Sequence, residues 1–293
     1  MKTRLAIFSA ALLLLPALAL LLAGAEWPQT HIMTGTVVLP LLCSILLLLV
    51  FSLVLDTHTL RRSGSSLLRK QRGYLLWNAA AGAITMVLLA YLNLYAGSWI
   101  NPVFSLGQML MLAALFGAVL LPAVLITRLW LAGFGGVARG LSRWPALPAV
   151  AAEQGAALLL LFALIGLLGG AVWPSKLFWL MWLSPLLLLV ALQLLWHEST
   201  VFSGLKQGDW SRVMLGGCAA MLAGGLSYAA YKLAGGALYL NVPPAFVPLA
   251  LFAFGLLCVQ LADVLAEHWR GKSLSQIYQQ KKPFPIQIVT KKD

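Results

Sequence analysis

MTGTVVLPLLCSILLLLVFSLVLDTHTLRR occupies residues 33–62 and is an apolar run that ends in charge. No charged side chain occurs before Asp56, and Arg61 and Arg62 close the stretch. An α-helix needs about 20 apolar residues to cross the roughly 30 Å hydrocarbon core of a bilayer. The stretch therefore predicts a transmembrane helix over residues 33–56, followed directly by a basic segment.

Runs of the same kind recur along all 293 residues, of which 61% are hydrophobic and only 10% are charged. An average soluble domain has about 25% charged residues. Spans are predicted at residues 5–25, 33–56, 75–98, 104–128, 154–173, 177–197, 212–234 and 245–267. The expected fold is an all-α integral membrane protein, a bundle of about eight transmembrane helices. Residues 1–268 would form one transmembrane domain, and 269–293 a basic cytoplasmic tail.

The basic residues predict the orientation of these spans. If both termini are cytoplasmic, all of the 20 Lys and Arg residues except Lys176 and Lys232 fall on the cytoplasmic side. This is the bias that the positive-inside rule describes. We therefore expect a multi-pass protein of a cell membrane, with a bacterial inner membrane as the predicted location. The net charge of +12 follows from the same rule, so no nucleic-acid partner is expected.

The first span allows a second interpretation, because Ala23-Gly24-Ala25 resembles a signal-peptidase site. Its apolar stretch of about 20 residues is longer than the 7–15 residues that are typical of a cleaved signal. The length favours a retained helix. Cleavage would leave seven spans with the new N-terminus outside.

Acidic and histidine side chains gather at the predicted inner ends of three spans. These candidate cytoplasmic residues are Asp56, His58, His197, Glu198, Asp263, Glu267 and His268. If the three spans are neighbours, imidazole and carboxylate groups suit a divalent metal, a haem or a proton relay to a quinol. The pattern selects no particular metal or cofactor. The competing interpretation is that polar side chains are tolerated where helices meet water.

A second set of candidates lies at the predicted outer ends of spans 75–98 and 212–234. It consists of Tyr91, Asn93, Tyr95, Trp99, Tyr228, Tyr231 and Lys232. Aromatic walls with a few hydrogen-bonding groups suit a quinone or a lipid headgroup. Tyr and Trp also concentrate at membrane interfaces without any ligand. The alternative is therefore that these side chains only anchor the helices at the interface.

Small residues at four-residue spacing indicate close helix packing, as at Gly166 and Gly170 in span 154–173. Gly216, Ala220 and Gly224 form a longer stripe in span 212–234. The stripes do not reveal whether each partner helix belongs to the same chain or to another.

Two functions follow from these features. The outer loops are short and no span has a charged residue at its centre, which favours a membrane subunit that anchors or assembles with other membrane or cytoplasmic proteins. Such a subunit would offer a candidate quinone or lipid site. The alternative is a membrane enzyme or carrier for a lipid-like substrate that uses the cytoplasmic acid–histidine residues. The zincin, GxSxG and Walker A motifs are all missing, so no motif decides whether the protein is an enzyme.

Overall fold

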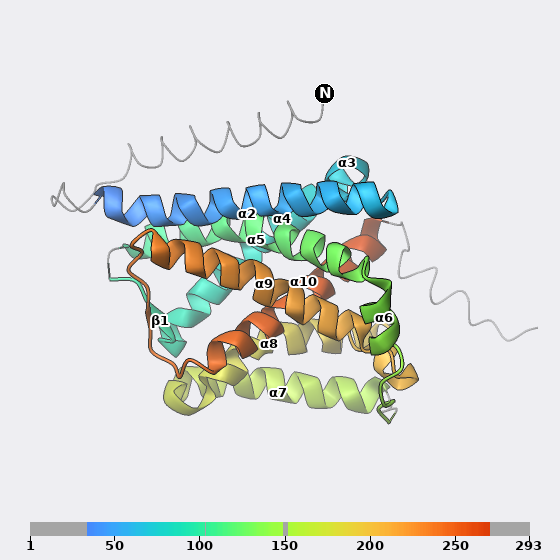
Figure 1. Ribbon diagram of the computed structural model, residues 1–293. Coiled ribbons are helices and arrows are strands. Elements are labelled where there is room, and N and C mark those ends of the chain that lie inside the picture. Colours follow the sequence, from blue (N-terminus) through green and yellow to red (C-terminus); the bar gives the residue numbers. More distant parts are fainter. Residues whose placement is uncertain (1–33, 103, 149–151, 270–293) are drawn as a thin grey trace, which may run out of the picture.

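The computed structural model describes residues 34–102, 104–148 and 152–269 (Figure 1). Seven long helices make up most of this part of the chain, and short helices and two-residue strands lie in the connections. The elements are α2 (Thr34–Ser63), α3 (Leu67–Lys70), α4 (Arg72–Ala96), β1 (Trp99–Ile100), α5 (Leu106–Ala132), α6 (Gly135–Leu141), α7 (Ala152–Val172), α8 (Pro174–Leu195), η1 (Ser203–Gln207), α9 (Ser211–Leu233), β2 (Tyr239–Leu240) and α10 (Phe246–Trp269).

The seven long helices are each long and apolar enough to cross a membrane. This confirms the predicted helical membrane architecture for the last seven predicted spans. The first predicted span, 5–25, and tail residues 270–293 lie outside the described residues. The total of eight spans and the orientation in the membrane therefore stay predictions.

Two helices continue at least four residues past their predicted ends. The span predicted at 33–56 reaches Ser63 in α2, and the span predicted at 104–128 reaches Ala132 in α5. Neither extension contains Gly or Pro, and each stops just before a glycine. Gly64 has φ +66°, a left-handed conformation that glycine adopts without steric cost and that commonly ends a helix. Helix α2 thus ends at a glycine rather than where hydrophobicity stops, and the extension of α5 is itself apolar.

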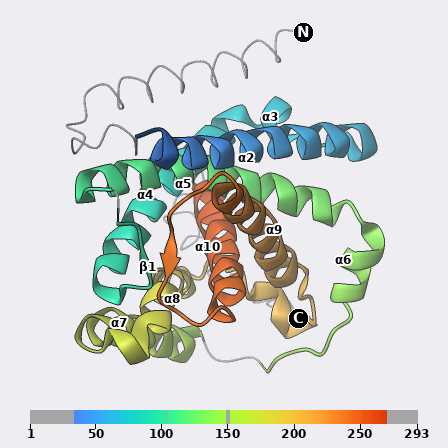
Figure 2. The same cartoon turned by 60° about the vertical axis from the view of Figure 1, so that its left-hand side comes forward.

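Helices α5, α9 and α10 form the interior of the bundle. The largest buried cluster joins Leu48 of α2, Leu121 and Val124 of α5, Ala220 of α9 and Cys258 of α10. Helix α2 lies at one edge and α7 at the opposite edge in both views of the ribbon (Figures 1 and 2). Helix α7 ends at Val172 and packs mainly against α8, which begins at Pro174, so the two helices form a tight hairpin.

The small-residue stripes pack against other helices of this chain. A Cβ added at Gly166 of α7 would collide with Ser184 and with the backbone of Leu180 on α8. A Cβ added at Gly216 of α9 would meet Val259 of α10, 2.8 Å away. The glycines therefore let neighbouring helices of the same chain approach closely, and they are not a free surface for a partner protein.

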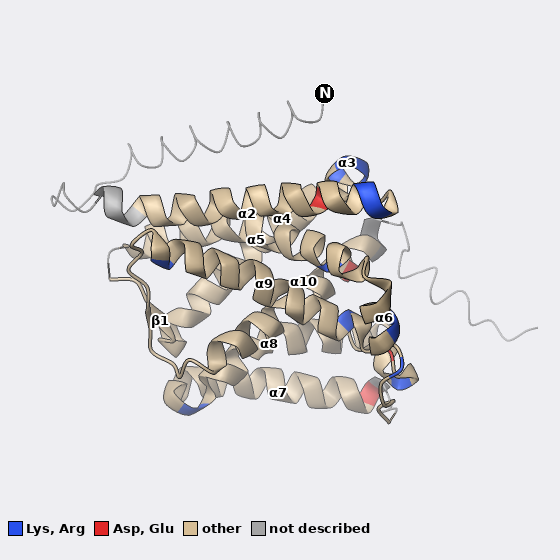
Figure 3. Cartoon of the chain, in the orientation of Figure 1, with Lys and Arg blue, Asp and Glu red and all other residues tan. Residues whose placement is uncertain are grey.

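Charged side chains concentrate at one end of the bundle, where α2 and α5 end and α4 and α9 begin (Figure 3). We call this the basic end. Lys176, near the start of α8, and Lys232, near the end of α9, belong to the other end. This segregation favours the predicted placement of the basic end in the cytoplasm.

Candidate functional site

The predicted acid–histidine residues sit on helices that are not all neighbours. Asp56 and His58 belong to α2, which packs mainly against α5 and α9. His197 follows α8, which packs mainly against α7 and α10. Asp263 lies on α10, beside α8 and α9. The structure gives no support to a single site formed by all three helix ends.

Metal binding by these residues is not supported either. Among the described residues, no group of three or more His, Cys, Asp or Glu is placed to hold a metal ion. The backbone of Glu267 and His268 belongs to α10, but their side chains lie outside the described part of the structure. Glu198 lies just past the end of α8 and donates its backbone N–H to the carbonyl of Gln193 at 2.9 Å.

Asp56 has a local structural role. Its side chain is only 2% exposed. It accepts hydrogen bonds from the Ser66 hydroxyl at 2.6 Å and from the backbone N–H groups of Leu67 and Leu68 at 3.0 and 3.4 Å. These bonds fasten the short α3 segment to α2. Asp56 thereby fixes the position of the connection between α2 and α4.

Replacing Asp56 by alanine should release this connection. We expect the free energy of unfolding to fall by about 1–2 kcal/mol, because the freed donors lie near the end of the bundle and can be solvated by water. Amide hydrogen exchange should accelerate at Leu67 and Leu68 in particular. Ser63→Ala is the matched control, because it removes a bond to the carbonyl of Thr59 and one from the Ser65 N–H and leaves the bonds of Asp56 in place. Unchanged exchange at Leu67 would show that Asp56 does not hold α3.

His58 and His197 also have local surroundings. The indole Nε1 of Trp130 donates to Nδ1 of His58 at 3.2 Å. Trp130 in turn makes an edge contact with Phe134, and the Arg62 guanidinium lies 4.7 Å from the centre of that ring. His197 is exposed and has φ 55°, so it turns the chain at the end of α8. Neither of these sets of contacts includes a second histidine.

An ion pair joins α9 to α10 at the basic end. The Arg212 guanidinium donates to the Asp263 carboxylate, and the two side chains are 27% and 22% exposed. Arg128 of α5 lies within electrostatic range of both groups. Arg128 lies about one helical turn before the end of α5, so its backbone is deeper in the bundle than the residues that end this helix.

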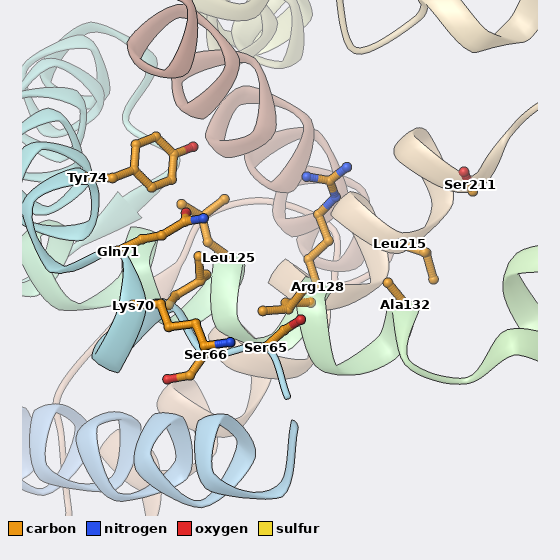
Figure 4. Close-up of a pocket in the computed structure, with 12 residues that line it drawn as sticks. Ser65, Ser66, Lys70, Gln71, Tyr74, Leu125, Arg128, Ala132, Ser211 and Leu215 are labelled. Carbon is orange, nitrogen blue, oxygen red and sulfur yellow. The ribbon is translucent and has the colours of Figure 1, made fainter. Parts of the chain in front are cut away.

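A cavity of about 510 Å³ opens beside Arg128, between α3, α4, α5 and α9 (Figure 4). In that view Tyr74, Gln71 and Lys70 lie on one side, Ser211 and Leu215 on the other, and Arg128 between them. Ligand pockets in proteins usually enclose about 300–1,000 Å³. The polar residues of the lining are Ser65, Ser66, Lys70, Gln71, Tyr74, Arg128 and Ser211.

The lining combines positive charge with an apolar wall. Lys70 and Arg128 are its charged residues, and no Asp or Glu lines the cavity. Leu125, Leu129 and Leu215 provide apolar surface beside them. An anion gains charge-assisted hydrogen bonds from such a lining, and an attached hydrocarbon chain gains burial. The cavity therefore suits the head and first carbons of an anionic amphiphile.

Sequence reasoning did not identify this cavity. Lys70 belongs to a basic loop and Arg128 to a predicted span end, so both count there as topology signals. The available signal was that Arg128 lies at the end of an apolar run, five residues before the glycine that stops the helix. Intramembrane or near-membrane cations of this kind are functional candidates by default.

The predicted outer residues lie at the other end of the bundle, where β1 pairs with β2. Asn93 is 4% exposed. Its Oδ1 accepts from the N–H groups of Ser98 and Trp99 at 2.9 and 3.2 Å, and its Nδ2 donates to the Trp99 carbonyl at 2.7 Å. Asn101 donates to the Tyr231 hydroxyl at 3.2 Å. These bonds connect the outer ends of α4 and α9 to the strand pair.

The remaining outer residues have contacts of their own. Tyr91 and Tyr95 are each 47% exposed and share a hydroxyl contact of 3.2 Å. Tyr228 is half-buried, and Lys232 is exposed and donates to the carbonyls of Gly236 and Leu238 at 3.4 Å each. The aromatic and amide groups have structural contacts here, and a quinone or lipid site at this end stays a prediction.

Asn93→Ala should loosen the turn between α4 and β1. We expect a loss of about 1–2 kcal/mol in the free energy of unfolding, because three backbone hydrogen bonds to the side chain disappear. Tyr95→Phe removes only an exposed hydroxyl contact and should change stability by less than about 0.5 kcal/mol. Thermal unfolding in detergent compares the two variants. Equal melting temperatures for both would contradict the role given to Asn93.

Comparisons of the chain with known protein families, with curated proteins and with solved structures give no match. The fold and the site define a class in physical terms. It is a bundle of membrane-length helices with a cationic, partly apolar cavity at its basic end.

Proposed function

We propose that this protein is a multi-pass membrane protein that binds an anionic, lipid-like ligand at its cytoplasmic face. The observation that carries the proposal is the Arg128 cavity, in which two cations and no carboxylate stand beside leucine side chains. The ligand's charged head would contact Arg128 and Lys70, and its hydrocarbon part would lie against Leu125, Leu129 and Leu215. The basic end is placed in the cytoplasm on the strength of the positive-inside rule.

Both functions predicted from the sequence, the assembly subunit and the enzyme or carrier, include a site for a lipid or a lipid-like substrate. Only the enzyme or carrier prediction puts that site at the cytoplasmic face, as proposed here. The binding residues, however, are Arg128 and its neighbours rather than the acid–histidine set. The small-residue stripes add no support to a role as an assembly subunit, because they pack against helices of the same chain.

Lipid retention tests the proposal directly. The full-length protein in mild detergent is mixed with equal amounts of phosphatidylglycerol, phosphatidic acid and phosphatidylcholine, and bound lipid is counted by native mass spectrometry. We expect the anionic lipids to be retained over phosphatidylcholine. Arg128→Gln should reduce their retention by about tenfold, the loss expected for a charge-assisted hydrogen bond.

Arg139→Gln is the matched control. Arg139 is exposed on α6 at the same end of the bundle and does not line the cavity. Its loss changes the net charge as the loss of Arg128 does, so general attraction to anionic lipid is held equal. Equal retention of the three lipids, or equal loss in the Arg139 and Arg128 variants, would contradict the proposed function.

A further inference from the structure

We infer that the cavity recognises a phosphomonoester, a terminal phosphate that carries close to two negative charges. The inference rests on the proposed function and specifies the chemical class of its ligand. Three features of the cavity support it: the charged residues of its lining, the presence of donors on several walls, and its size.

The charge balance favours a dianion. Lys70 and Arg128 bring two positive charges to the lining, and none of the lining residues is acidic. Of the nearby acids, Asp263, whose charge also acts on Arg128, is paired with Arg212. Asp56 lies behind the α3 wall, where it accepts hydrogen bonds from neutral groups, the Ser66 hydroxyl and the first backbone N–H groups of α3. A phosphomonoester carries about −1.5 to −2 charges near pH 7, whereas a phosphodiester or a carboxylate carries one.

The donors lie on several walls of the cavity. Lys70 belongs to α3, Arg128 to α5 and Ser211 to the start of α9, which are separate walls of the cavity (Figure 4). A terminal phosphate has three acceptor oxygens in a tetrahedral arrangement, so it can accept from several walls together. The two oxygens of a carboxylate lie in one plane and suit a single bidentate partner such as one arginine.

The α3 wall is built to hold its position. Ser66 donates to the buried carboxylate of Asp56, and the Lys70 ammonium donates to the Gly64 carbonyl at 2.5 Å. A neutral acceptor, the Gly64 carbonyl, therefore holds Lys70 against the connection between α2 and α4. A phosphate oxygen is a stronger acceptor than a carbonyl for an ammonium donor, so Lys70 would exchange this contact for the ligand.

The volume indicates that phosphate is only part of the ligand. About 510 Å³ exceeds what one phosphate group fills, and the leucine wall leaves room for a glycerol unit and the first carbons of an acyl chain. The shared chemistry is a phosphate monoester head, whether it belongs to a lipid or to a small soluble molecule. The leucine wall favours the lipid source.

Calorimetric titration of the full-length protein in detergent tests the inference with three probes. They are dihexanoyl phosphatidic acid, dihexanoyl phosphatidylglycerol and inorganic phosphate. We expect phosphatidic acid to bind about tenfold or more tightly than phosphatidylglycerol, because only the first presents a dianion. Inorganic phosphate should compete with it, at a much weaker affinity than the lipid. Phosphate that binds as tightly as phosphatidic acid would support phosphate recognition and overturn the lipid source.

The variants locate the effect. Lys70→Gln and Arg128→Gln should each lower the affinity for phosphatidic acid by about tenfold and bring it close to the affinity for phosphatidylglycerol. Lys70 is exposed, so its variant keeps the test valid if the Arg128 variant does not fold. Lys206→Gln on η1, an exposed site away from the lining, is the control and should leave the ratio unchanged.

Two outcomes separate this inference from the proposed function. Equal, Arg128-dependent affinity for the two lipids would overturn the phosphomonoester inference and leave the anionic-ligand proposal in place. Binding of neither lipid would overturn both.

Discussion

Replacing Gly117 by alanine is expected to separate α4 from α5 and to give the largest loss of stability among single substitutions considered for this chain. A Cβ at Gly117 would lie against the carbonyl oxygen of Gly82 and the side chain of Met86, well inside van der Waals contact. Backbone atoms of a packed helix cannot rotate away. The free energy of unfolding should therefore fall by about 3 kcal/mol, the upper end of the usual overpacking range.

Gly107→Ala is the matched control, because Gly107 belongs to the same helix and a Cβ there meets nothing within 4 Å. Alanine in a helix is favoured over glycine by roughly 0.5–1 kcal/mol, so this variant should be as stable as the original protein or slightly more stable. Thermal unfolding followed by tryptophan fluorescence measures both. A Gly117 variant with an unchanged melting temperature would contradict the close crossing of α4 and α5.

Removing the charge of Asp263 is expected to produce the second large effect. In Asp263→Asn, Arg212 loses its carboxylate partner, and Arg128 loses a negative charge that acts on it. Breaking a fully buried ion pair costs roughly 3–5 kcal/mol. The two partners are 27% and 22% exposed, so we expect about 2–3 kcal/mol here.

The double variant Arg212→Gln with Asp263→Asn tests the origin of that loss. It removes the ion pair without leaving Arg212 unpartnered, so it should recover part of the stability of the single Asp263 variant. The two single variants and the double variant are compared by thermal unfolding in the same detergent. Losses that simply add would show that the two side chains do not interact.

Hydrophobicity along the chain predicted the long helices well, because a run of about 20 apolar residues has few alternatives to a membrane span. The ends were less predictable. Residues 57–63 are polar and basic, yet they continue α2, since helix formation there depends on the absence of Gly and Pro more than on burial. Gly64 marked the end of α2 more reliably than the change in hydropathy did.

The candidate site could not be derived from the sequence, because span ends fix the depth of a residue but not the side of the bundle that it faces. His58 and His197 share a predicted depth, yet their helices have different neighbours. In a membrane, lipid-facing and protein-facing sides are both apolar, so periodicity gives little information about which helices touch. The Arg128 cavity depends on such contacts among α3, α4, α5 and α9.

The most direct test of the central claim is a cryo-electron microscopy map of the full-length protein in nanodiscs that contain phosphatidic acid. The account predicts ligand density within hydrogen-bond distance of the Arg128 guanidinium, with an acyl chain running along Leu125 and Leu129. A map with ordered lipid elsewhere on the protein and no ligand density beside Arg128 would contradict it.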